Sequence, residues 1–101
     1  MIKLMALYKK PDDEATFLKH YNEVHIPLVN KVPGLARTVI NRVTASPLGG
    51  DPEYFLIAEM HYPDKETFDA AMASPENRAC GKDLMSFAKG RVTLLIADEQ
   101  A

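Results

Sequence analysis

The chain has 101 residues, 47% of them hydrophobic and 26% charged, which is the balance of a single globular domain spanning residues 1–101. Its net charge of −2, with both signs spread along the chain, predicts no nucleic-acid partner and no attraction to an anionic membrane. The longest apolar runs are far shorter than the roughly 20 residues that cross a bilayer, and the N-terminal stretch lacks a signal-peptide pattern. We therefore expect a cytoplasmic protein, and its single cysteine excludes an internal disulfide and a structural zinc site.

The first part of the chain predicts a strand followed by a long helix. Residues 2–8 are apolar apart from Lys3, which favours a mostly buried central strand. An acidic turn then begins a helix that we expect to run over residues 13–31 and to end at the Pro-Gly pair of residues 33–34. The side chains that share the inward face of this helix at helical spacing are Glu14, Phe17, Leu18, Tyr21, His25, Leu28 and Val29.

Two features of this helix are unusual for a segment whose only role is to pack against the sheet. Pro27 lacks an amide hydrogen and its ring clashes with the carbonyl of Glu23, so we expect a kink or a break there. His20 lies five positions before His25, a spacing that points two side chains well apart in an α-helix. We therefore expect His20 at the solvent edge and His25 on the inward face.

The second half of the chain predicts three more strands and two helical segments. Residues 35–45 mix polar and apolar side chains on both faces, which suits an edge strand. After the breaker-rich loop of residues 46–52, residues 54–62 form a strand that is apolar on both faces apart from Glu59 and His61. The remaining elements are helices over residues 64–73 and 75–89 and a last strand over residues 91–97.

The order strand, helix, strand, strand, helix, strand predicts a ferredoxin-like α+β sandwich of the βαββαβ type, with a four-stranded antiparallel sheet. Right-handed crossovers place both helical regions on one face of that sheet. The other face carries apolar side chains of the third strand, and no element of the chain is left to cover it. We therefore expect a homodimer whose sheets face each other.

Among residues that carry chemistry, His25 is the strongest candidate. The sequence has no Gly-rich phosphate loop, no zinc-type His/Cys spacing and no nucleophile elbow, so we expect no metal and nothing requires a cofactor. An imidazole exchanges protons near neutral pH, and helical spacing puts His25 over the sheet beside Tyr21. The alternative is a buried histidine bonded to a backbone carbonyl, such as the one that Pro27 would free.

Asp83 is the second candidate, because a carboxylate on a helix facing the sheet is costly to bury unless it is paired. It could reach His25 and orient its ring, or it could sit at the surface or brace a loop. Glu59 and His61 lie two residues apart on one face of a strand. They form either an acid/base pair or, in the interpretation we favour, polar contacts in the interface between two copies.

Three stretches of the chain resemble the EthD family, named for ethyl tert-butyl ether degradation. HYNEVHIPLVNKVPGL resembles its H-Y-x-x-x-H-x-P-L…PGL motif, AEMHYPDKETFDAAM its central motif, and DLMSFAKGRVTLLIADE its closing D-x-x-x-F stretch and last strand. The resemblance extends from Ile2 to about Glu99 and implies a dimeric α+β barrel with a ligand pocket between each sheet and its helices. By motif, His25 matches the family's histidine and Asp83 its late aspartate, whereas Tyr62 stands where the family usually has Phe.

The resulting hypothesis is a small enzyme or accessory protein that acts on a small hydrophobic organic molecule, by cofactor-independent oxygenation, isomerisation or dehydration. His25 would be the general base or acid and Asp83 its orienting partner. The side chains expected to contact the substrate are Tyr8, Tyr21, Leu28, Met60, Tyr62 and Phe68. Two alternatives stay open: a non-catalytic carrier of a hydrophobic molecule, and a haem-binding protein with His25 or His61 as axial ligand.

Overall fold

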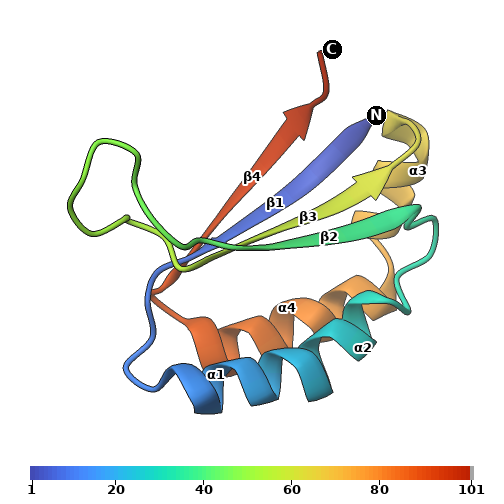
Figure 1. Ribbon diagram of the computed structural model, residues 1–101. Helices are drawn as coiled ribbons and strands as arrows, with labels where there is room; N and C mark the ends of the chain where they lie inside the picture. The colour runs from blue at the N-terminus through green and yellow to red at the C-terminus, as the bar shows by residue number, and fades with distance from the viewer. Residues whose placement is uncertain (101) are drawn as a thin grey trace.

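The computed structural model describes residues 1–100 and contains one antiparallel sheet with the strand order β2-β3-β1-β4. The strands are β1 (Ile2–Tyr8), β2 (Arg37–Arg42), β3 (Leu56–Tyr62) and β4 (Val92–Asp98). The helices are α1 (Glu14–His20), the π-helical turn η1 (Tyr21–His25), α2 (Ile26–Val29), α3 (Lys65–Met72) and α4 (Pro75–Ala88). Helices α1, α2 and α4 lie along one face of the sheet, and α3 lies near the end of β3 (Figure 1). The predicted ferredoxin-like fold is confirmed, with β1 central and β2 at an edge.

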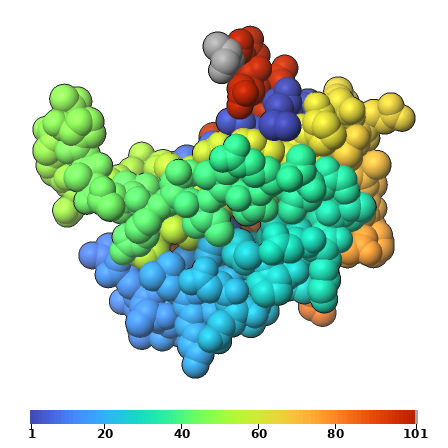
Figure 2. Space-filling view, turned by 45° about the vertical axis from the view of Figure 1, so that its right-hand side comes forward, coloured from blue at the N-terminus to red at the C-terminus, as the bar shows by residue number. Residues whose placement is uncertain are grey.

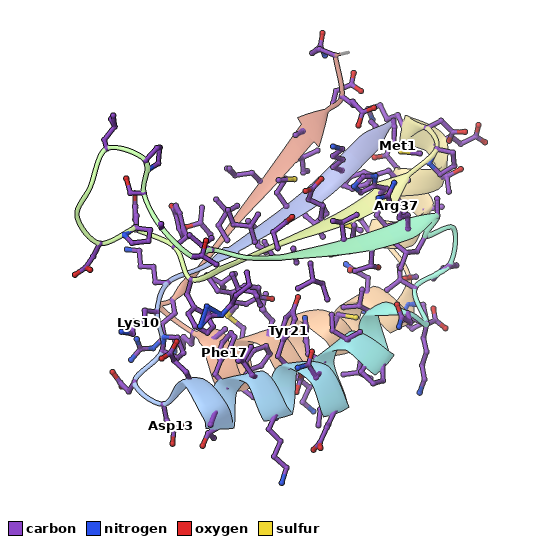
Figure 3. All side chains as sticks on the ribbon, viewed as in Figure 1. Met1, Lys10, Asp13, Phe17, Tyr21 and Arg37 are labelled. Atoms are coloured by element: carbon purple, nitrogen blue, oxygen red, sulfur yellow. The ribbon has the colours of Figure 1, made fainter. Side chains whose placement is uncertain are left out.

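The strand register divides the side chains of the sheet between two faces. Ala6 of β1 lies opposite Ala58 of β3 and Leu94 of β4, so these three side chains share the face that meets the helices. On the helix side, Phe17 and Tyr21 project from the first helix toward the sheet (Figure 3). Their rings pack edge-on against Tyr8, with centroids 5.5 and 5.4 Å away. This aromatic cluster attaches the first helix to β1.

The sequence predicts a kink or a break at Pro27. The first helix is continuous, so the break is wrong, but the helix departs from α geometry just before the proline. The amide of Ile26 donates to the carbonyl of Tyr21, five residues earlier, which makes η1 a single π-helical turn that ends two residues before Pro27. A π turn carries one residue more than an α-helical turn, and this wider turn relieves the contact between a proline ring and the preceding turn. The chain therefore passes from α1 through η1 into α2 without leaving the helix (Figure 1).

The π turn also explains which residues of the first helix are buried. Phe17, Tyr21, His25 and Val29 are all buried, although each lies four positions after the one before. In an ideal α-helix these 12 positions amount to about 3.3 turns, so the last residue would be rotated by about a third of a turn from the first. The extra residue of η1 takes up that rotation and keeps the four side chains on one face.

The outer face of the sheet, on the side away from the helices, is not covered by any part of residues 1–100. Register places the apolar side chains of Met5, Leu7, Val39, Ile57 and Leu95 on this outer face. Strand β4 is the most exposed element of the sheet, and half of the Leu95 side chain faces solvent. An apolar surface of this kind is typical of a contact with another protein. Among the described helices, none has the length and apolar character that a membrane crossing would require.

The loop that joins β2 to β3 extends away from the body of the molecule, as Figure 2 shows. At the opposite end of β2, the turn that ends the first helix contains Gly34, whose φ of 80° belongs to the left-handed region. A methyl group on Gly34 would collide with the methyl group of Thr67 in α3. A glycine is thus required here both by its backbone angle and by the close approach of α3.

We predict that Gly34→Ala lowers the free energy of unfolding by about 2–4 kcal/mol, because backbone strain and a steric clash act together. Gly50 is the matched control, since its φ of 79° is equally left-handed but a Cβ there meets no atom within 4 Å. Gly50→Ala should cost only about 1 kcal/mol. Urea unfolding at one protein concentration measures both values, and equal losses would show that Thr67 does not restrict this position.

Candidate functional site

A cavity of about 160 Å³ lies between the sheet and the helices. Its wall combines the inner faces of β1, β3 and β4 with side chains of the first helix and of α4, and most of these side chains are apolar. The lining residues are Leu4, Ala6, Tyr8, His25, Val29, Val32, Met60, Tyr62, Met72, Asn77, Cys80, Gly81, Leu84 and Leu94. The polar groups that the wall offers are therefore an imidazole, an amide, two phenol hydroxyls and a thiol.

Four of the residues predicted for the site lie in this wall. Tyr8, Met60 and Tyr62 come from neighbouring strands, and His25 comes from the π turn. Their meeting follows from the strand order, because β1 and β3 are paired and the first helix packs across them. These four predicted residues therefore lie together on one side of the cavity.

Three other predicted contact residues lie outside the wall. Tyr21 packs between Tyr8 and the ring of His25, whose centroid is 5.7 Å away. Phe68 of α3 packs edge-on against Tyr62 at 5.3 Å. Leu28 does not line the cavity, whereas its neighbour Val29 does, because the π turn shifts the inward face of the helix by one residue.

The wall residues that the sequence did not identify come mainly from α4 and β4. Gly81 lies within α4, and open space surrounds the position that its Cβ would occupy. A glycine inside a helix is a weak point unless the missing side chain leaves room for something, so Gly81 was the available signal. No local sequence signal marks Leu94 as a wall residue, because its position beside the cavity depends on the pairing of β4 with β1.

His25 is held by Asp83 of α4. Nδ1 of the imidazole lies 3.0 Å from Oδ2 of the carboxylate, and the side chains are 6% and 13% exposed. The hydrogen-bond partner of His25 is thus the predicted aspartate and not the backbone carbonyl of Glu23. Because a carboxylate oxygen only accepts, Nδ1 carries the hydrogen when the ring is neutral, and Nε2 has a free lone pair. The hydrogen bond of the His25 ring within residues 1–100 is the one at Nδ1, which leaves Nε2 without a partner in the described part of the chain.

His20 lies on the same carboxylate, which contradicts the expectation that the two histidines point apart. Its Nε2 is 2.9 Å from Oδ1 of Asp83, and its ring packs on Phe87 with a centroid distance of 4.7 Å. Residues five apart diverge in an α-helix but lie nearly above one another where the spacing is i→i+5. The π turn between His20 and His25 therefore brings both rings to one aspartate.

Burial and hydrogen bonding set the charges of this group. Burial lowers the pKa of His25 below the ordinary value of 6.5, and the hydrogen bond to Asp83 only partly opposes this effect. For Asp83, burial favours the neutral acid, but hydrogen bonds from His25 and His20 outweigh it and lower the pKa. Near neutral pH the pair is therefore an imidazole without charge beside a carboxylate, and the imidazole can accept a proton at Nε2.

The other ionisable groups of the wall stay protonated. Burial raises the pKa of Tyr8, and the nearby Tyr21 and the negative charge of Asp83 raise it further. Burial also raises the pKa of Tyr62 and of the Cys80 thiol. The two tyrosines are thus hydrogen-bond donors rather than bases, and Cys80 is a poor nucleophile.

Glu59 and His61 lie on the outer face of the sheet, away from the cavity. Oε1 of Glu59 accepts hydrogen bonds from His61 Nε2 at 3.1 Å and from Lys3 Nζ at 3.2 Å. Burial would raise the pKa of Glu59, but these bonds and one from Asn41 lower it. In the part of the chain that the structure describes, no group of His, Cys, Asp and Glu side chains is arranged to hold a metal ion.

Comparison with known proteins gives one family. A model of the EthD domain matches residues 9–91. A Rhodococcus erythropolis protein, described as an uncharacterized 11.0 kDa protein in the thcB-thcC intergenic region, is 32% identical over 100 residues, covering 99% of this chain and 96% of that protein. The crystal structure of an EthD family protein from Bacillus halodurans is 42% identical, with a TM-score of 0.94 and coverage of 99% of both chains.

Two more distant crystal structures share the fold. One is a dimeric ferredoxin-like protein of unknown function from Thermobifida fusca, with 14% identity, a TM-score of 0.70 and coverage of 97% of this chain and 90% of that chain. The other is SnoaB, a cofactor-independent oxygenase from Streptomyces nogalater, with 14% identity, a TM-score of 0.69 and coverage of 99% and 93%. Both likenesses support the ferredoxin-like fold of this chain.

The lowered pKa of His25 predicts how stability depends on pH. Below about pH 6.5 the unfolded chain binds a proton at His25 that the folded protein does not bind, so the free energy of unfolding falls as the pH is lowered. One proton gives a slope of at most about 1.4 kcal/mol per pH unit.

Urea unfolding between pH 5 and 8, at one protein concentration, should show this slope in the wild type, and His25→Gln should reduce it. His61→Gln, on the outer face, should retain it. An unchanged slope in His25→Gln would contradict the assignment.

Proposed function

The chain belongs to the EthD family, and from this membership and the geometry of the cavity we propose that it is a small enzyme that transfers a proton to or from a small hydrophobic organic molecule. The observation that carries the proposal is His25, a neutral imidazole in an apolar wall whose Nδ1 is bound to Asp83 and whose Nε2 is unpaired. A base held in this way is suited to abstract a proton near neutral pH.

The size of the cavity limits the substrate to about one aromatic ring with small fused or attached groups. A dry apolar cavity of about 150 Å³ holds a molecule of benzene, and the cavity next to His25 measures about 160 Å³. Apart from His25, most of the wall is formed by side chains such as Leu4, Met60 and Leu84. These side chains favour an uncharged ligand.

The first chemical step would be removal of a proton from a carbon or oxygen next to a carbonyl or an aromatic ring. His25 Nε2 accepts the proton, and the positive charge of the resulting imidazolium is stabilised by the Asp83 carboxylate. The hydroxyl of Tyr62, or that of Tyr8, donates a hydrogen bond to the substrate oxygen on which negative charge develops. The product is a carbanion or enolate when the proton leaves carbon and a phenolate when it leaves oxygen, and such anions are the common starting point of isomerisation, dehydration and cofactor-independent oxygenation. SnoaB, which has the same fold, is described as a cofactor-independent oxygenase.

The haem alternative does not fit the residues present. A porphyrin is several times larger than the single aromatic ring that a cavity of about 150 Å³ holds, and the cavity at His25 is of that smaller size. His61, the other suggested ligand, is 6% exposed and hydrogen-bonded through Nε2 to Glu59 on the outer face. We therefore derive no step through haem.

Proton abstraction is testable without knowledge of the natural substrate. In D2O, we expect the wild-type protein to accelerate deuterium incorporation at the carbons next to the carbonyl of 2-indanone, followed by ¹H NMR. His25→Gln should lower the rate by about 10²–10⁴-fold, the usual contribution of a general base, and Asp83→Asn should also lower it. Thermal unfolding and oligomeric state serve as controls for each variant. A wild type that binds 2-indanone without exchange would identify a carrier, the non-catalytic alternative.

We further infer that two copies of the chain associate through the outer faces of their sheets. An outer face that carries Met5, Leu7, Ile57 and Leu95 is apolar enough to form such an interface. A domain of this size buries only about 60–65% of its unfolded surface, so association would add to its stability.

The interface predicts that Leu95→Glu weakens the dimer by at least about 100-fold in dissociation constant, because the charge would be buried against the partner. Met85→Glu is the matched control, since Met85 is similarly exposed but lies on α4, on the helix side of the molecule. Sedimentation velocity over a dilution series measures both. A Leu95→Glu protein that stays as dimeric as Met85→Glu would place the interface elsewhere.

A further inference from the structure

The Asp83 carboxylate receives an N–H group at each of its two oxygens. Oδ2 accepts from His25 Nδ1 at 3.0 Å and Oδ1 from His20 Nε2 at 2.9 Å. A further donor, the Ser86 hydroxyl, is 3.4 Å from Oδ1 but donates to the backbone carbonyl of Asp83 at 2.6 Å. His20 is therefore the principal partner of Oδ1.

A carboxylate held at one oxygen remains free to rotate about its Cβ–Cγ bond, whereas one held at both oxygens has a fixed plane. The orientation of the carboxylate matters at this site, because Oδ2 decides which ring nitrogen of His25 carries the hydrogen. If Asp83 turned away, the neutral ring could carry its hydrogen on Nε2 instead. That nitrogen would then be unable to accept a proton from a ligand in the cavity.

His20 is itself held in a defined position. Its ring packs on Phe87, four residues after Asp83 on α4, at a centroid distance of 4.7 Å. The same Phe87 ring lies 5.1 Å from His25, so one aromatic side chain supports both imidazoles. The His20 side chain is 32% exposed, whereas that of His25 is 6% exposed. His20 therefore forms the solvent side of the cluster and does not line the cavity.

We propose that His20 is a positioning residue: by donating from Nε2 to Oδ1, it fixes the Asp83 carboxylate and thereby keeps the hydrogen of His25 on Nδ1 and its Nε2 free. The π turn is the backbone feature that makes this possible, since it brings residues 20 and 25 to the same carboxylate. The consequence for catalysis rests on the proposed function of His25 as a general base, but the effect on the His25 ring does not.

The surroundings of His25 contain few other groups that could replace His20. The titratable side chains near the ring are Tyr21 on its own helix, Tyr8 on β1, and Cys80 and Asp83 on α4. Tyr8, Tyr21 and Cys80 remain protonated because burial raises the pKa of each. A change in His25 on removal of His20 would thus be transmitted through Asp83.

Two substitutions separate the N–H group of His20 from its ring. His20→Phe keeps an aromatic ring to pack on Phe87 but removes the donor, whereas His20→Gln keeps an N–H donor at similar reach and removes the ring. In ¹⁵N-labelled protein, ¹H–¹⁵N spectra of the imidazoles report which nitrogen of His25 carries the hydrogen and how fast that hydrogen exchanges with water. We expect exchange in His20→Phe to be about 10-fold faster than in the wild type, as for loss of one hydrogen bond to a charged group. His20→Gln should stay within about 2-fold of the wild type.

The proposal is overturned if His25 in His20→Phe keeps the exchange rate and tautomer of the wild type, or if His20→Gln changes them as much as His20→Phe does. Thermal unfolding of both variants shows whether the fold is retained, and a variant that is less stable but has unchanged His25 signals also counts against the proposal. Deuterium exchange of 2-indanone adds a second measurement, in which His20→Phe should lower kcat and leave KM unchanged. If the wild type catalyses no exchange at all, the proposed function fails, whereas the ring spectra still decide the role of His20.

Discussion

The structure depends on how one partly buried carboxylate is hydrogen-bonded. The Asp83 side chain projects from α4 toward the first helix and is 13% exposed, so an unpaired carboxylate there would be costly to bury. Two histidine N–H groups offset this cost, and both come from the first helix. This hydrogen-bonded cluster thus joins the first helix to α4, and it does so next to the wall of the cavity. The same hydrogen bonds therefore stabilise the packing of the two helices and orient the His25 ring.

The geometry of the first helix follows from this requirement. A regular α-helix cannot present Phe17, Tyr21, His25 and Val29 to the sheet while also turning His20 toward Asp83. One π-helical turn meets both demands. Such turns are rare in proteins as a whole, but those that occur are often found at functional sites. Pro27 lies two residues after this turn, where its ring would clash with a preceding α-helical turn. The proline and the two histidines are thus parts of one local arrangement.

The sequence predicted the elements of the fold because their signals are local. Proline, glycine and capping residues such as Ser74 and Asp64 mark helix ends, and the strands show clear runs of apolar residues. The pairing of His25 with Asp83 was also within reach, because helical spacing turns both toward the same layer. The contact between His20 and Asp83 could not be predicted in this way. The α-helical period points His20 away from His25, whereas the π turn η1 brings both rings to one carboxylate. Leu94 and the remaining wall from β4 depend on strand pairing between distant parts of the chain, which no local pattern contains.

The balance of forces on His25 explains why a buried histidine is suited to this cavity. Burial alone would leave the imidazole neutral but a weak base, whereas a nearby carboxylate alone would raise its pKa and keep it charged. In this site burial is the larger effect and Asp83 the smaller one, so the ring is neutral at rest and a positive charge on it is still stabilised. An apolar wall makes that stabilisation stronger than it would be in water, because the effective dielectric constant is lower. The apolar wall of the cavity, which on the proposed function would hold a hydrophobic substrate, therefore also sets the basicity of His25.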